Sequence, residues 1–192
     1  MLFNVIKQFN WVDISIIILV LRICFTSYET GLPVTLFKLL GTLAALYLSM
    51  HYYTWLSDQL MRLPFARVFP LTFMDFVCFL VLMVLGYGIF IFLRIMVHRF
   101  LKMEAVPVLN KWGGLVLGII RAVLVAGLFI FSLRISTAGY LMRSAVKSYS
   151  GTYLLHVAPS VYSWMWYGVA SRFAVNEKFN STVNEIERGL YN

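Results

Sequence analysis

Charged residues are scarce in this chain of 192 residues. Only 12% of them are charged, whereas a soluble domain carries about 25%, and 61% are hydrophobic. So few charges could not cover the surface of an ordinary globule, which argues against a soluble enzyme. Disorder requires the opposite bias, so it is excluded as well. Together with a mean hydropathy of +0.82, the composition predicts a protein whose surroundings are largely lipid.

Cysteine and acidic residues are also rare. Cys24 and Cys78 each lie in an apolar run without a second Cys or a His at metal-ligand spacing, so we expect free thiols and no metal site. The 16 Lys and Arg exceed the 8 Asp and Glu, giving +8. The excess is spread along the chain, which is typical of helix ends near anionic lipid. It forms no basic stripe of the kind that binds nucleic acid, so we expect no nucleic-acid partner.

Four apolar stretches are long enough to cross a bilayer, and they occupy residues 11–28, 33–55, 71–97 and 112–133. Thr30, Gly31 and Pro33 indicate a tight turn between the first two. We therefore expect an all-α, polytopic membrane protein, with four transmembrane helices in a domain over residues 1–135.

No small-residue cleavage site follows the first stretch, so we expect it to stay in the mature protein. Basic residues are balanced between the two sides, and the orientation is left open.

The tail, residues 136–192, has a different character. Its aromatic residues cluster between positions 153 and 170, with Pro159 near the middle. Because Trp and Tyr favour the headgroup level, we expect an interfacial amphipathic helix over residues 160–173 rather than a fifth span. Glu177, Glu185 and Glu187 mark a short C-terminus, which we expect to be exposed to water. Three histidines, at positions 51, 98 and 156, are interpreted as polar residues at the membrane boundary.

Motifs of known chemistry are absent from the sequence. It contains no paired catalytic carboxylates, no Ser, His and Asp set, no H-E-x-x-H and no phosphate-binding glycine loop. We therefore expect no catalytic residues, no cofactor and no enzymatic activity.

Small residues recur every four positions in the last stretch: Gly114, Gly118, Ala122 and Ala126. This spacing places them on one narrow strip of a helix. In a membrane, small residues allow two helix backbones to approach closely. The strip is therefore predicted to pack a helix, either within the bundle or against a second copy of the chain.

Arg121 lies beside this strip, about 14 Å into its span, where an unpaired arginine is costly. We expect it to point into the bundle. Asp75 is the acidic partner that we consider first, and Asp13 is another intramembrane acid. Arg22 is a second deep cation. These residues indicate either a polar path or substrate site inside the bundle, or a purely structural role for the arginine, as an ion pair or hydrogen-bonded to backbone carbonyls.

These residues also carry a resemblance to the CvpA family, the four-span bacterial inner-membrane proteins named for colicin V production. The similar segments are Asn10-Trp11-Val12-Asp13, the turn that ends in Gly31, and Gly114-x-x-x-Gly118-Ile-Ile-Arg121-Ala122. The chain departs from the family pattern at three positions: it has Thr30 where the family usually has Arg, Asn110 where it commonly has Asp, and Ala122 where it has Gly.

The resemblance implies a part in colicin V (toxin) production or export and in envelope and biofilm physiology. We expect a non-enzymatic scaffold or accessory of a membrane system, surrounded by the lipid bilayer. A membrane protein or a second copy of the chain would be its partner. The alternative is a small channel or transporter with an arginine-containing polar interior.

Overall fold

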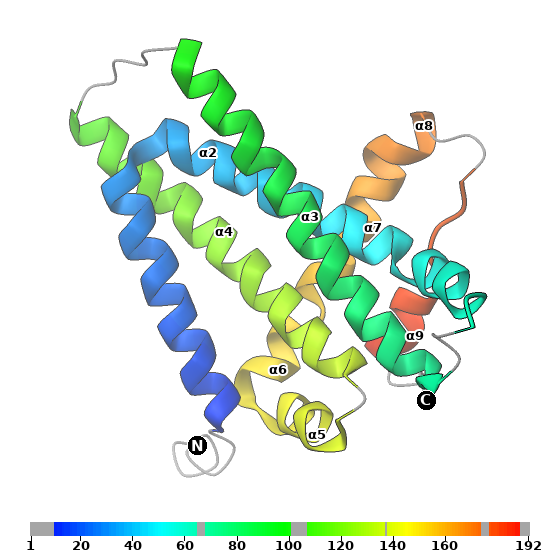
Figure 1. Ribbon diagram of the computed structural model, residues 1–192. Helices are drawn as coiled ribbons and strands as arrows, with labels where there is room; N and C mark the ends of the chain where they lie inside the picture. The colour runs from blue at the N-terminus through cyan, green and yellow to red at the C-terminus, as the bar shows by residue number, and fades with distance from the viewer. Residues whose placement is uncertain (1–9, 65–67, 101–106, 137, 174–176, 189–192) are drawn as a thin grey trace.

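The computed structural model describes residues 10–64, 68–100, 107–136, 138–173 and 177–188. Within these ranges the chain is all-helical, which confirms the expected class (Figure 1). The long helices are α2 (Trp11–Met61), α3 (Leu71–Phe100) and α4 (Pro107–Ile135). Shorter elements follow: α5 (Gly139–Lys147), α6 (Tyr149–Leu154), α7 (Val157–Met165), the π-helical segment η2 (Trp166–Ala170), α8 (Ser171–Phe173) and α9 (Thr182–Arg188).

Helix α2 is interrupted by a kink at Gly31. Its backbone there has φ 76° and ψ 177°, a conformation that is open essentially only to glycine. The N–H of Leu32, which the kink frees, donates to Asn110 Oδ1 of α4 at 2.7 Å. The kink divides α2 into a first arm, residues 11–30, and a second arm, residues 32–61, which run in different directions in Figure 1.

Three helices in the described part of the chain are long and apolar enough to cross a membrane: α2, the Leu71–Leu93 part of α3, and the Val108–Ile135 part of α4. They indicate a multi-pass membrane protein. The kinked α2 counts once in this total, whereas the sequence predicts two crossings for the same residues. Both arms of α2 pack against the other long helices, and the main core lies between the second arm, α3 and α4.

The tail is more helical than the sequence indicated. Helices α5 and α6 lie beside the N-terminal end of α2 and the C-terminal end of α4 (Figure 1). The helix expected at residues 160–173 begins earlier, at Val157. Pro159 lies in its first turn, where the missing N–H costs no hydrogen bond. Helix α9 buries Val183 and Ile186 in the main core, so the expectation of a wholly water-exposed end is wrong.

Candidate functional site: an arginine groove between the helices

The small-residue strip of α4 faces the first arm of α2. A Cβ atom at Gly114 would lie 2.5 Å from the backbone oxygen of Ser27 and 2.8 Å from the carbonyl carbon of Gly31. A Cβ atom at Gly118 would lie 2.5 Å from that of Ser27. Further along the strip, Ala122 and Ala126 are fully buried. The missing side chains therefore let the two helix backbones approach closely, and this contact fixes the direction in which Arg121 leaves α4.

Arg121 occupies the midpoint of α4, about 21 Å along the helix from either end. Its Nε donates to the Thr42 hydroxyl at 3.3 Å, and one terminal nitrogen donates to the Tyr87 hydroxyl at 2.9 Å. The guanidinium carbon also lies 5.6 Å from the centre of the Tyr87 ring, within cation–π range. Arg121 thus points into the space between α3 and the second arm of α2. It has one uncharged partner on each of these two helices.

The two hydroxyls are not equivalent. Thr42 donates its own proton to the Lys38 carbonyl at 2.9 Å, so its oxygen is directed to accept from Arg121. Tyr87 accepts from Arg121, and its O–H has no acceptor among the described residues. An acidic group entering from outside would therefore find two donors, the Arg121 guanidinium and the Tyr87 hydroxyl.

A cavity of about 330 Å³ lies beside these three side chains. Its remaining lining is apolar or glycine and comes from α2, α3 and α4: Ala45, Met83, Val84, Gly88, Ile91, Val125 and Leu128. Gly88 has open space where a side chain would be, since nothing lies within 4 Å of the Cβ position. We call this cavity, with Thr42, Tyr87 and Arg121, the Arg121 groove.

The predicted pairing of Arg121 with Asp75 is wrong. Asp75 is buried near the start of α3 and accepts a hydrogen bond from Ser57. Tyr87, which does contact Arg121, lies about 18 Å further along α3, beyond the reach of one arginine side chain. No acidic side chain in the described ranges forms an ion pair with Arg121.

The other two polar candidates lie elsewhere. Arg22 is exposed on the first arm of α2 and does not line the groove, so the two deep arginines do not share a site. Asp13 is buried at the start of α2, where it accepts from the backbone N–H of Asn10 at 2.9 Å and from that of Ser150 at 2.8 Å. Asp13 therefore caps α2 and ties it to α6.

A family model described as Colicin V production protein matches residues 12–159, which is most of the chain. The chain belongs to this family. The match confirms the resemblance to the CvpA family and supports a part in colicin V production. It spans the whole Arg121 groove and ends at Pro159, early in α7. No curated protein and no solved structure matches the chain.

Beyond the part that matches the colicin V production family, the tail closes onto the second arm of α2. Glu177 accepts from the Tyr52 hydroxyl at 2.8 Å and contacts Nε2 of His51 at 3.0 Å. The other ring nitrogen, Nδ1, lies 2.8 Å from the Tyr162 hydroxyl, which accepts from the N–H of Asn180 at 3.1 Å. We call these residues the His51 cluster.

The His51 cluster has a defined direction of donation. Burial raises the pKa of the Tyr162 hydroxyl to about 12, so it keeps its proton and donates it to Nδ1 of His51. His51 then carries its own proton on Nε2 and donates to Glu177. His51 is buried inside the protein, and its interpretation as a residue at the level of the membrane boundary stays a prediction. Its partners lie more than 100 residues away, and no sequence signal marks them.

Proposed function

We propose that the protein is a non-enzymatic accessory of a membrane system in the bacterial inner membrane. In this proposal it crosses the membrane four times and serves colicin V production or export, together with envelope and biofilm physiology. The kink at Gly31 supports four crossings, because the arms of α2 extend about 30 Å and about 45 Å. Each is long enough for a hydrocarbon core of about 30 Å.

The Arg121 groove carries the proposal. A cation at the middle of a span costs roughly 2.5–3.5 kcal/mol on insertion scales. Its two hydroxyl partners reduce this cost without neutralising the charge. An acidic side chain on a membrane-spanning helix of a partner protein would neutralise it. Such a side chain could accept from both Arg121 and Tyr87 while the rest of its helix packed on the apolar lining.

The groove favours docking over conduction. Only three of its lining side chains are polar, and the second deep arginine, Arg22, lies outside it. A site with one cation and two hydroxyl groups in an otherwise apolar lining is suited to holding one acidic group. It offers little to a stream of hydrated ions, which requires a continuous polar path.

Complementation in cells tests this proposal. Cells that produce colicin V and lack the protein would receive wild type, Arg121→Gln, Arg121→Lys or Arg22→Gln, at equal levels in the membrane. We expect Arg121→Gln to abolish the zone of growth inhibition, Arg121→Lys to restore part of it, and Arg22→Gln to behave as wild type. An Arg121→Gln variant with full toxin output would overturn the proposal.

The alternative, a small channel or transporter, is favoured by one observation: a cavity reaches Arg121, which is half-buried. Liposomes with purified protein separate the two functions. A flux of protons or ions that disappears in Arg121→Leu would support the channel. Membranes that stay tight while complementation depends on Arg121 would support the accessory role.

Labelling of single cysteines tests the topology. In a background without native cysteines, four crossings place Leu63 and Tyr140 on one side of the membrane and Glu29 on the other. Glu185 should be labelled from the same side as Tyr140, because we propose that the tail lies along the membrane. Labelling of positions 29 and 63 from one side would refute the separate crossings of the two arms, and opposite labelling of 140 and 185 would indicate a fifth span.

A further inference from the structure

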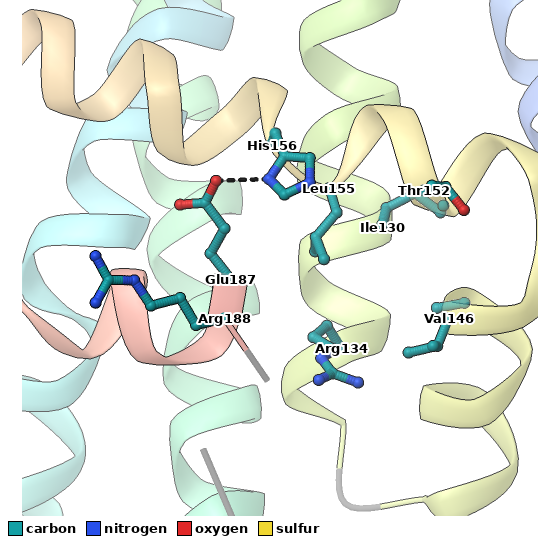
Figure 2. A pocket seen from close by; sticks show the side chains of 10 residues that line it. Ile130, Arg134, Val146, Thr152, Leu155, His156, Glu187 and Arg188 are labelled. Atoms are coloured by element: carbon teal, nitrogen blue, oxygen red, sulfur yellow. Dashed lines mark hydrogen bonds and ion pairs between the residues drawn. The ribbon is translucent and has the colours of Figure 1, made fainter. Parts of the chain in front are cut away.

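A second cavity, of about 260 Å³, opens where α4 meets the tail. Figure 2 shows Arg134 of α4 on one side of it and Arg188 of α9 across from it. On a third side His156 Nδ1 contacts Glu187 Oε1 at 2.6 Å. We call this cavity the Arg134 pocket. It is separate from the Arg121 groove, since Arg134 lies about 20 Å further along α4.

Arg134 is the more buried of the two cations that line the pocket. It lies in the last turn of α4 and is half-buried. Figure 2 shows its guanidinium turned away from the His156–Glu187 pair. Within the described ranges it forms no hydrogen bond and no ion pair. A planar guanidinium with all its donors unused is suited to bidentate recognition of a phosphate group.

The remaining polar groups leave the pocket positively charged. Glu187 is the only acid among the lining residues, and His156 already binds it. Arg188 is exposed, and its guanidinium is turned away from Arg134 in Figure 2, so it is a second cation that must rotate to reach a ligand. The Thr152 hydroxyl makes only a long bond of 3.5 Å to the Ser148 carbonyl, which leaves it able to donate elsewhere.

The position of the pocket indicates where a phosphate would come from. The candidate span in α4 ends at Ile135, one residue beyond Arg134. Three tyrosines nearby are exposed, Tyr140 by 70%, Tyr149 by 42% and Tyr153 by 64%, and Tyr favours the headgroup level. The other walls are apolar and include Ile130, Val146 and Leu155. Such walls suit the glycerol and upper acyl part of a lipid.

We propose that the Arg134 pocket binds a phosphate group, with Arg134 as the main contact and Arg188 and Thr152 as further donors. The apolar walls favour the phosphodiester of an anionic phospholipid over a free phosphate. A lipid held there would bridge α4 to α5, α6 and α9. It would thereby connect the membrane-spanning helices to the tail.

Native mass spectrometry of the full-length protein in detergent tests this assignment. The probes are phosphatidylglycerol, diacylglycerol as the lipid without phosphate, and inorganic phosphate. The variants are Arg134→Gln, Val146→Glu and Arg143→Gln. Val146 is 51% exposed, so an acidic residue there should alter the pocket without disturbing the core. Arg143 is exposed on α5 outside the pocket lining, so its variant controls for loss of one positive charge.

We expect phosphatidylglycerol to bind wild type and Arg143→Gln equally, and Arg134→Gln and Val146→Glu about fivefold more weakly. Diacylglycerol, which lacks the phosphate, should not show these differences between the variants. If inorganic phosphate binds with the same differences between variants and the lipid does not bind, the pocket is a phosphate site for a soluble ligand. Equal lipid binding by Arg134→Gln and Arg143→Gln would overturn the proposal, as would diacylglycerol binding as tightly as phosphatidylglycerol. If Arg134→Gln fails to fold, lipid binding by Val146→Glu is compared with that of Arg143→Gln instead, and equal binding by these two variants would overturn the proposal.

Discussion

The contact between α4 and the kink of α2 predicts a large effect from a single methyl group. In Gly114→Ala, the new Cβ would lie 2.5 Å from the Ser27 oxygen and 2.8 Å from the Gly31 carbonyl carbon. Both atoms belong to the backbone and cannot rotate away as a side chain would. The helices must therefore separate, or the kink must change shape.

The size of the effect follows from two opposing terms. Overpacking a well-packed contact costs about 1–3 kcal/mol, and backbone atoms as neighbours place this site at the upper end. Alanine is a better helix former than glycine by about 1 kcal/mol, which offsets part of the cost. We expect a net loss of about 2 kcal/mol in the free energy of unfolding. For a chain of this size that corresponds to a fall of about 4–8 °C in melting temperature.

Thermal unfolding in detergent, followed by intrinsic fluorescence, measures this loss. Gly88→Ala is the matched control, since it also adds one methyl group in the interior of a helix. Nothing lies within 4 Å of that Cβ position, so its melting temperature should be unchanged or slightly higher. If Gly114→Ala unfolds at the same temperature as Gly88→Ala, the close approach of α4 to the kink does not exist.

Three further substitutions give expected losses in the same unfolding assay. Gly31→Ala should lower the free energy of unfolding by about 3 kcal/mol, because it places a side chain in a glycine-only backbone conformation and against the Asn110 side chain. An unchanged melting temperature would mean that the kink is absent. Tyr87→Phe should cost about 2 kcal/mol, since a hydrogen bond to a charged group is lost and the ring remains; an unchanged melting temperature would contradict the Arg121 contact. Glu177→Gln should cost about 1 kcal/mol or less, because its side chain is 40% exposed, and high salt should remove the difference from wild type.

Local sequence signals predicted the features of this protein that depend on local physics. Runs of apolar residues indicated the long helices and the all-helical class, since helix formation and membrane crossing depend on neighbouring residues. The glycine and proline near position 31 marked a change in chain direction, which the structure has as a kink in α2 rather than a separate loop. The family resemblance rested on short motifs and was confirmed by the match over residues 12–159.

Contacts between distant residues were not predictable in the same way. The inward direction of Arg121 could be predicted but not its partners, because composition indicates which charges exist and not which hydroxyls lie within reach. Tyr87 and Thr42 carry no signal that distinguishes them from other residues of apolar helices. The His51 cluster joins residues 126 positions apart, and a histidine near a helix end gives no indication of such a partner. Helices α5 and α6 of the tail were missed because they are only nine and six residues long.

The hydrogen bond between Leu32 and Asn110 also sets an order of events during biosynthesis. The two residues are separated by 78 positions, and synthesis at about 5–20 residues per second supplies Asn110 about 4–16 s after Leu32. During that interval the kink of α2 has a backbone donor without its final acceptor. The kink therefore completes its hydrogen bonding only when α4 packs against it.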